Sequence, residues 1–450
     1  MVDAEEDEKT LAHCFGKPYE APVFPPPNWF GDVFSGQFGM RQTLLGVSSL
    51  LLGMALLMLG NGSLPTVLAV RLAASGESAW LIGLVMAQYY VGIVLGTLYG
   101  HKLIFTVGHI RAFATFGSTM SAVTLAHAFI GDPWAWAVFR FLVGACAVGM
   151  LMCVESWLNA RTDNEGRGHV FSLYVITVYL FQGISQFLIQ LPDTTGFAIY
   201  AVLSVLMSLS IVPVAVTRVP APVLPEASRF DFVKLWRTSP TGMVVSLISG
   251  VIQGAFCGLG PVFAKFSGFN RAGIALFMSV VILGGLLLQW PVGKFSDGRD
   301  RRRFMFAVNI LLAAVCTVIA VTGVAGLGLI GLAIVFGGLS SALYPLAVAY
   351  TNDYLEPENL VPAAGGLVMA YGIGAIAGPP VAALSIEFFG AVGLFLFCGI
   401  VATCAAGLIF WRMRQFEALS LEDQGNFLAV SRTSPVASEL DPRGNFDSQE

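Results

Sequence analysis

Twelve apolar runs of about 20 residues follow one another along this chain of 450 residues. A helix of that length crosses the roughly 30 Å hydrocarbon core of a bilayer, because it rises about 1.5 Å per residue. The runs therefore predict an all-α polytopic membrane protein with twelve transmembrane helices. They occupy approximately residues 44–69, 80–100, 110–130, 134–157, 170–191, 196–217, 241–263, 274–293, 304–323, 326–350, 361–384 and 388–411.

The composition and the distribution of charge argue against soluble classes of protein. Hydrophobic residues make up 56% of the chain and charged residues 12%, against about 45–50% and about 25% in soluble domains. The formal charge of −4 is the balance of two acidic ends, residues 1–42 and 415–450, and a basic apolar core, residues 43–414. Positive charge that belongs to an apolar core predicts the lipid bilayer as a partner and no nucleic acid.

The sequence lacks the motifs of metal, nucleotide and catalytic sites. Its seven cysteines lie mostly in apolar runs, without a Cys-x-x-Cys pair or a histidine at ligand spacing. Gly293-Lys294 is followed by Phe295 rather than by the Ser or Thr of a phosphate-binding loop. We therefore expect no metal, no cofactor and no enzymatic activity.

Lysine and arginine set the orientation of the predicted spans. If the N-terminus is cytoplasmic, fifteen basic residues flank the cytoplasmic ends of the spans and three flank the outer ends. Cytoplasmic loops of membrane proteins carry such an excess of positive charge. We expect both termini to be cytoplasmic.

The longest internal polar stretch divides the chain into two similar halves. It covers residues 218–240, contains four prolines and follows the sixth span. We expect six-helix bundles at residues 43–217 and 241–414, joined by this cytoplasmic loop and flanked by cytoplasmic tails at 1–42 and 415–450.

The two tails carry different patterns. Phe30, Phe34 and Phe38 recur every four residues, which is compatible with a short helix lying in the membrane interface or with a linker carrying scattered aromatic residues. The C-terminal tail is rich in Ser, Asp and Glu and has almost no apolar pattern, so we expect it to be disordered.

Two basic turns, six spans apart, indicate an internal repeat. Residues 293–303 read Gly-Lys-Phe-Ser-Asp-Gly-Arg-Asp-Arg-Arg-Arg, and residues 100–111 are a second turn that contains Gly and basic residues, with Phe105 in the place of the acidic residue. The first of these resembles the loop signature of the major facilitator superfamily. Arg140-Phe-Leu-Val-Gly144 in the fourth span is similar to the Arg-x-x-x-Gly element of the same superfamily.

Three further segments resemble the YcaD-like branch of that superfamily. They are Glu-Ser-Trp-Leu-Asn at 155–159, Gly-His-Ile-Arg-Ala-Phe at 108–113, and Leu-Tyr-Pro-Leu-Ala at 343–347 with Asn-Asp at 352–353. The resemblance runs across nearly all twelve spans. It implies the major facilitator fold, two six-helix bundles with pseudo-symmetry, and a transporter whose spans 1, 4, 7 and 10 line a central path.

Arg140 is the most informative single residue. It lies about six residues inside the fourth span, where a charge facing lipid costs at least about 2.5–3.5 kcal/mol. It must therefore point into the protein or into a wet cavity. A packing arginine is one interpretation, and a role in substrate binding or proton coupling is the other.

Other polar residues within the spans extend the candidate substrate site. Gln182, Gln186 and Gln190 form a stripe on one helix face that binds either neighbouring helices or a polar solute. With Arg140, the candidates for the cavity are Asn61, Gln88, Gln182, Gln186, Gln253, Tyr344 and Tyr371.

Carboxylates are scarce in the spans, and two are candidates for proton coupling. Glu155 and Asp353 occupy equivalent positions at the cytoplasmic ends of spans 4 and 10. Coupling requires a group whose charge changes between states. The alternative interpretation pairs each carboxylate with a nearby arginine, such as Arg161 for Glu155.

The turn that starts at Gly293 contains a candidate cytoplasmic latch. Asp297 can accept hydrogen bonds from amides at a helix N-terminus and can pair with Arg301 or Arg302. A solvated basic turn explains the arginines but leaves Asp297 at this spacing unexplained.

The eleventh span carries a candidate gate. Gly374, Gly378 and Pro379 combine small residues four apart, which permit close helix contact, with a proline that removes a backbone donor. Such elements are packing features as often as hinges.

Together these features favour a secondary active transporter of the bacterial cell inner membrane that moves a small solute by alternating access. Protons are the candidate coupling ion, and we expect a monomer. A transporter-derived receptor or assembly factor without solute flux is the main alternative, and a membrane enzyme acting on lipid is another. The buried arginine favours an anionic or zwitterionic solute.

Overall fold

The computed structural model describes residues 47–160, 167–191, 196–216, 232–322, 326–356, 359–415, 424–425 and 427. The described residues all belong to one compact unit, Gly46–Glu450. The predicted interfacial helix around Phe34, most of the loop at 218–240 and most of the C-terminal tail lie outside the described residues.

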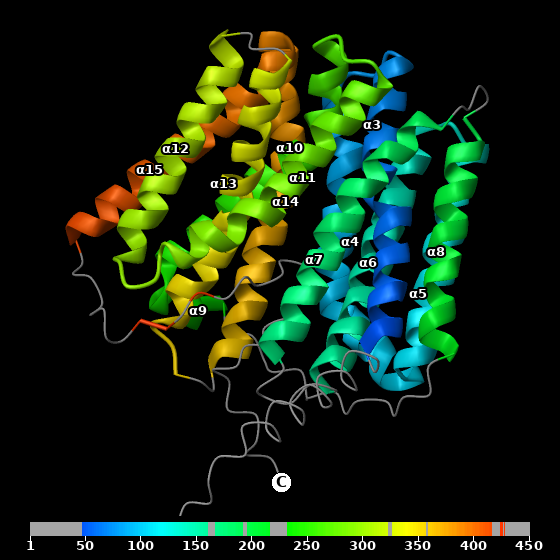
Figure 1. The fold of residues 1–450 in the computed structure, drawn as a ribbon, viewed down its shortest axis with the longest axis horizontal. Coiled ribbons are helices and arrows are strands. Elements are labelled where there is room, and N and C mark those ends of the chain that lie inside the picture. The colour runs from blue at the N-terminus through cyan, green and yellow to red at the C-terminus, as the bar shows by residue number, and fades with distance from the viewer. Residues whose placement is uncertain are drawn as a thin grey trace, which may run out of the picture. The chain divides into compact units, whose positions relative to one another are not determined.

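The first half of the described chain consists of helices that run back and forth (Figure 1). The first span, Val47–Ala74, is interrupted by a turn at Ser63, after which α3 begins. Ser78 and Asp132 accept backbone hydrogen bonds at the starts of the second and fourth spans. The elements are α3 (Leu64–Ala74), α4 (Ala79–Val107), α5 (His109–Phe129), α6 (Pro133–Ala160), α7 (Arg167–Ser185) with the 3₁₀ turn η1 (Gln186–Gln190), and α8 (Ala198–Val216).

The second half repeats this pattern. Asn270 caps its second long helix by accepting from the backbone N–H of Gly273. The elements are α9 (Phe232–Thr238), α10 (Pro240–Phe266), α11 (Arg271–Lys294), α12 (Arg301–Thr322), α13 (Leu327–Asn352), α14 (Leu360–Phe389), the 3₁₀ turn η3 (Gly390–Val392) and α15 (Gly393–Gln415).

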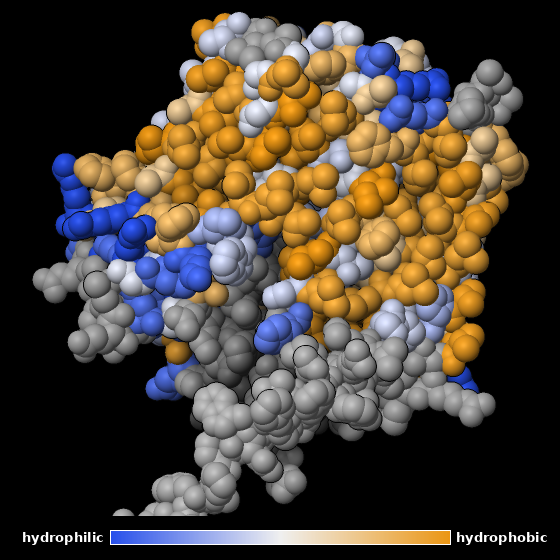
Figure 2. Space-filling view, in the orientation of Figure 1, coloured by the Kyte–Doolittle hydropathy of each residue, from blue (hydrophilic) through white to orange (hydrophobic). Residues whose placement is uncertain are grey.

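The described helices confirm the prediction of an all-helical multi-pass membrane protein. Ten helices of the described chain are long and apolar enough to cross a bilayer. One of these, Pro362–Gln415, spans α14 and α15, and α5 is not among the ten. Apolar side chains cover the described surface in a broad band, and polar side chains gather beyond it, at the lower left and at the upper right of the view (Figure 2). The count of twelve spans stays a prediction.

The first of the two basic turns differs from its prediction. Residues 100–107 continue α4 as a helix, and the chain turns only at Gly108, whose φ is 85°. Glycine adopts this left-handed conformation at low cost. The turn is therefore much shorter than its counterpart in the second half, where residues 295–300 separate α11 from α12.

Reciprocal glycines bring equivalent helix pairs of the two halves into close contact. A Cβ on Gly144 of α6 would lie 2.0 Å from the carbonyl oxygen of Tyr89 on α4, and a Cβ on Gly92 of α4 would lie 2.1 Å from that of Phe141. In the second half, Gly284 of α11 and Gly337 of α13 approach each other's helices in the same way. Small residues permit this close backbone approach between membrane helices.

Substitution of Gly144 by alanine is expected to lower stability. The new Cβ would meet backbone rather than a flexible side chain, so α4 or α6 must shift. Overpacking of this kind costs about 1–3 kcal/mol, which thermal unfolding of the detergent-solubilised protein would show as a lower Tm. Gly331→Ala on α13 is the matched control, because no atom lies within 4 Å of its added Cβ. An equal Tm for the two variants would contradict the contact.

Candidate functional site

A cavity of ≈ 100 Å³ lies between the two halves of the described chain. Its wall is built by the first span, α4, α6, α7 with η1, α10, α11 and α13. The lining residues are Asn61, Gly62, Pro65, Thr66, Met86, Tyr89, Tyr90, Arg140, Tyr179, Gln182, Gln186, Gln253, Phe256, Cys257, Gly258, Met278, Val281, Ile282 and Ser341.

Arg140 supplies the positive charge of this cavity. Its side chain is buried, with 3% of its surface exposed, and its guanidinium carbon lies 4.4 Å from the centre of the Tyr89 ring. Within the described part of the chain, its Nε and Nη1 have no hydrogen-bond partner. A buried charge is costly unless it is paired, so these two nitrogens are suited to receive an anionic group.

The close contact between α4 and α6 explains the place of Tyr89. Gly144 lies one helical turn after Arg140 and touches the backbone of Tyr89. The absence of a side chain there lets α4 approach, so that the Tyr89 ring covers the guanidinium. Asn61 donates to the Tyr89 hydroxyl across 3.4 Å.

Glutamines hold the cavity wall together from both halves. Gln186 donates from Nε2 to the carbonyl of Gly62 at 2.8 Å and accepts from Thr66 at 2.7 Å. Gln253 on α10 lies 3.1 Å and 3.2 Å from the hydroxyls of Ser340 and Ser341. Both Gln182 and Gln186 line the cavity, and Gln186 also binds a neighbouring helix.

Five of the eight residues proposed for the cavity line it, and three do not. Gln88 lies outside the lining, beside Tyr89 on α4. Tyr344 and Tyr371 pack edge to face with their ring centres 5.4 Å apart, in a cluster beside the cavity. On α13, Ser341 rather than Tyr344 reaches the wall. The five that line it are Arg140, Asn61, Gln182, Gln186 and Gln253.

The structure adds lining residues that the sequence analysis did not select. Tyr179 lies three residues before Gln182, and Cys257 lies four residues after Gln253. Residues three or four apart share a helix face, so Tyr179 and Cys257 could have been predicted as lining residues from their spacing to Gln182 and Gln253. Tyr179 also donates from its hydroxyl to Gln289 on α11 at 3.0 Å, which joins the two halves.

The two candidate coupling carboxylates lie outside the cavity wall. Glu155 is fully buried on α6 and accepts a hydrogen bond of 2.8 Å from the Tyr174 hydroxyl. Arg161, its proposed partner, lies outside the described residues. Asp353 follows α13, and its Oδ2 lies 3.3 Å from Nη1 of Arg301.

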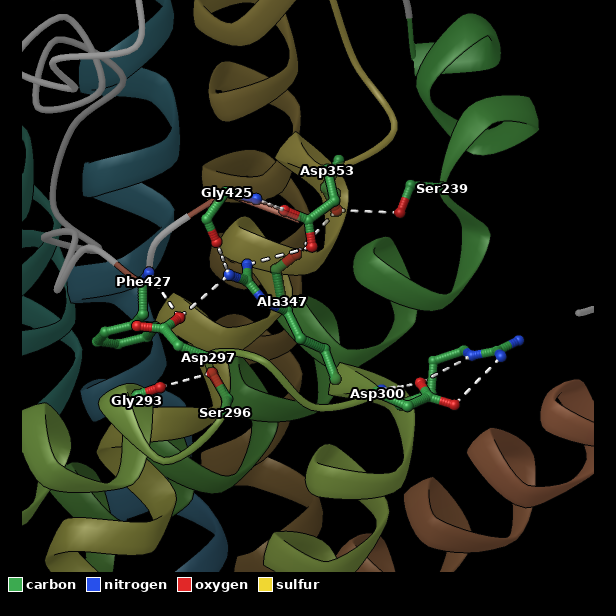
Figure 3. Close-up of polar contacts among 12 residues, drawn as sticks. Ser239, Gly293, Ser296, Asp297, Asp300, Ala347, Asp353, Gly425 and Phe427 are labelled. Atoms are coloured by element: carbon green, nitrogen blue, oxygen red, sulfur yellow. Dashed lines mark hydrogen bonds and ion pairs between the residues drawn. The ribbon is translucent and has the colours of Figure 1, made fainter. Parts of the chain in front are cut away.

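Arg301 is the centre of an ionic cluster at the predicted cytoplasmic end of the second half (Figure 3). This side chain is 1% exposed, and it bridges Asp297 and Asp353 with N···O distances of 3.3 Å to each. The cluster therefore ties the turn between α11 and α12 to the end of α13.

Asp300 takes the capping role that the sequence analysis gave to Asp297. It accepts at 3.0 Å from the backbone N–H of Arg302 in the first turn of α12, and it also pairs with the Arg302 side chain at 3.2 Å. Burial raises the pKa of the nearby Tyr354 hydroxyl above its ordinary value. Asp297 pairs with Arg301 instead of Arg302.

The candidate gate on α14 lies in a closely packed interface. A Cβ on Gly374 would lie 2.0 Å from the carbonyl oxygen of Leu247, and one on Gly378 would lie 2.3 Å from that of Val251, both on α10. The helix continues through Pro379 to Phe389. These contacts favour the packing interpretation of the glycines.

Comparison with known proteins agrees with this architecture. The model of the Major Facilitator Superfamily matches residues 50–299 and 243–437. The chain belongs to the major facilitator superfamily. Members of this superfamily bind small-molecule solutes, and the chain is a transporter rather than an enzyme, as the sequence analysis predicted.

Two relatives support the resemblance to the YcaD-like branch. An uncharacterized MFS-type transporter of Enterobacter sp. (strain 638) is 26% identical over 367 residues, which cover 80% of this chain and 93% of that protein. The uncharacterized MFS-type transporter YcaD of Escherichia coli O17:K52:H18 is 27% identical over 368 residues, with the same two coverages of 80% and 93%.

A solved structure confirms the major facilitator fold. The crystal structure of the nucleoside transporter NupG aligns with a TM-score of 0.68 at 13% sequence identity. The alignment covers 83% of this chain and 100% of NupG. At this identity the likeness concerns the fold alone.

Proposed function

We propose that this protein is a secondary active transporter that moves a small organic anion or zwitterion by alternating access. The observation that carries the proposal is Arg140, a buried cation in the cavity wall with two nitrogens that have no partner within the described residues. The described lining contains no Asp or Glu, so the cavity has no acidic group to attract a cation.

The contacts between the halves support a two-state mechanism. At the end of the bundle opposite Val47 and Gln415, the backbone N–H of Trp80 donates to Glu387 at 3.1 Å, and Lys265 donates to the carbonyl of Val70 at 3.4 Å. We interpret this as a state that is closed at the outer side. The two halves, 43–217 and 241–414, would rock about the central site.

A solute drives such a change only through different affinities for the two states. Arg140 on α6 and Gln253 on α10 belong to different halves and line one cavity, so a solute that contacts both would favour the state that brings them together. Contact of the solute with both halves is the least that alternating access requires of a central site.

Protons are the proposed coupling ion, and Glu155 is the better of the two carboxylate candidates. Asp353 is held in an ion pair with Arg301, which favours its charged form. Glu155 is fully buried among the helices of the first half, where it accepts a hydrogen bond from the Tyr174 hydroxyl, and this places it inside the bundle rather than in that ion pair. The excess of basic residues on one side supports an orientation with both termini in the cytoplasm, and the membrane that we propose is the bacterial inner membrane.

Thermal-shift screening with ligands grouped by charge tests the proposed substrate class. A ligand at about 100 times its Kd stabilises the native state by about 2.7 kcal/mol, so organic anions or zwitterions are expected to raise the Tm of the purified protein. The ligands found are then tested for flux into liposomes with and without an imposed pH gradient. Stabilisation by cations alone would contradict the substrate class, and binding without flux would favour a receptor.

A further inference from the structure

A short part of the C-terminal tail is bound to the ionic cluster around Arg301. The backbone N–H of Phe427 donates to Oδ1 of Asp297 at 2.8 Å, and that of Gly425 donates to Oδ1 of Asp353 at 3.1 Å. Arg301 in turn donates from Nη2 to the carbonyl of Gly425. Figure 3 shows Gly425 beside Asp353 and Phe427 beside Asp297. All three charged residues therefore bind tail backbone, and hydrogen bonds to charged groups are the stronger kind.

The Phe427 ring fills a specific place on α11. Gly293 has no side chain, and a Cβ built there would lie 2.0–2.3 Å from atoms of the Phe427 ring. The ring therefore rests directly on the backbone of α11, in the last turn of the helix. Together, Gly425 and Phe427 form what we call the docking segment.

The same face of α11 is the face that contacts α7 in the other half. Gly285, Gln289 and Gly293 are spaced four residues apart and lie along one stripe of the helix. Tyr179 of α7 contacts the first two, because its ring lies 2.9 Å from a Cβ built on Gly285 and its hydroxyl donates to Gln289. Phe427 covers the third.

The helix α7 runs antiparallel to α11, and its continuation leads towards the docking segment. Gly183 of α7 faces Leu283 of α11, and Tyr179 faces Gly285 and Gln289. The next residues on this side of α7 are Ile176, which is 44% exposed, and Val175, which is partly buried. If the two halves closed at this end, this part of α7 would approach Gly293, where the Phe427 ring now lies.

We propose that the docking segment is a built-in inhibitory wedge, which holds the contact between α7 and α11 open at its cytoplasmic end. The inference rests on the proposed alternating access, since a wedge acts only on a protein that closes. The acidic tail thereby gains a role that is distinct from substrate binding. Release of the segment from Asp297, Arg301 and Asp353 would allow the cytoplasmic side to close.

Cys257 is a native reporter for this proposal, because it lines the cavity and is partly exposed. Inverted membrane vesicles are treated with a membrane-impermeant maleimide, and alkylation of Cys257 is followed by peptide mass spectrometry. Deletion of residues 416–450 and Phe427→Ala are both expected to slow alkylation from the cytoplasmic side about fivefold. The loss of one good contact typically changes the ratio of two conformations, here those open and closed to the cytoplasm, by about this factor. Deletion of residues 431–450 keeps the docking segment and is expected to leave the rate unchanged.

The outcomes separate this proposal from the proposed function. Unchanged or faster cytoplasmic alkylation in Phe427→Ala, with a monodisperse protein, would overturn the wedge. Right-side-out vesicles supply the second measurement, in which outer-side alkylation of Cys257 is expected to rise when the segment is lost. If Cys257 reacts from both sides at rates that no deletion changes, the wedge fails while alternating access stands. If it never reacts from the outer side in any variant, alternating access fails as well.

Discussion

Replacement of Arg140 by glutamine is expected to weaken the binding of an anionic substrate about 100-fold. Truncation of one partner of a buried, hydrogen-bonded charge pair costs about 2–5 kcal/mol, and Arg140 is the charged residue in the described cavity wall. Glutamine keeps a polar side chain but removes the charge and the planar fork of donors. The measurement is the Kd of an anion identified by thermal shift, determined by calorimetry on the purified variant.

Two companion variants make this result specific. Arg140→Lys keeps the charge without the fork and is expected to lose about tenfold in affinity, between wild type and glutamine. Arg71→Gln is the matched control, because Arg71 is bonded to the carbonyl of Gly196 at 3.0 Å and lies outside the cavity wall. Full affinity in Arg140→Gln, or an equal loss in Arg71→Gln, would show that the charge of Arg140 does not bind the substrate.

The sequence was sufficient to identify Arg140 but not the aromatic ring of Tyr89 that packs against it. A charge inside an apolar span is visible in the sequence, since its cost in lipid does not depend on tertiary detail. The position of Tyr89 over the guanidinium depends on the distance between α4 and α6, which Gly144 and Gly92 set by direct backbone contact. A sequence shows that such glycines are present but not which helix each one meets.

The apolar membrane-spanning segments could be predicted because the length of an apolar run can be read directly from the sequence. The ends of the helices were harder to predict, since polar residues can continue a helix beyond the lipid. The run predicted at 80–100 belongs to a helix that extends to Val107. The chain turns at Gly108, which has a positive φ. The sequence alone does not show whether the turn lies at Gly100 or at Gly108.

The site at the end of the second half shows a similar limit. The sequence predicted a candidate latch in which Asp297 pairs with Arg301 or Arg302, because residues four or five positions apart around a helix start lie close together. Asp353 is predicted from the sequence as a candidate for proton coupling. Its ion pair with Arg301 joins residues 52 positions apart, and a contact at that separation cannot be read from sequence spacing. The tail was predicted to be disordered from its composition, and the binding of Gly425 and Phe427 depends on their backbone amides, which composition does not reveal.

Replacement of Arg301 by glutamine is expected to produce the largest loss of stability among single substitutions in this cluster. Its removal leaves Asp353, whose side chain is 3% exposed, as a buried carboxylate without its cation. Breaking a buried ion pair from one side costs about 3–5 kcal/mol, and the half-buried Asp297 adds a smaller penalty. The measurement is the free energy of unfolding in detergent, compared with wild type.

A second substitution shows whether the loss comes from the uncompensated charge. In Arg301→Gln with Asp353→Asn, the buried carboxylate becomes a neutral amide, so stability is expected to recover by about half or more of the loss. Arg303→Gln is the control with the same chemistry at an exposed site. Its side chain is 79% exposed and lies 3.7 Å from Asp300, so we expect a change of less than about 1 kcal/mol. A double variant no more stable than Arg301→Gln would instead assign the loss to the packing of the arginine side chain.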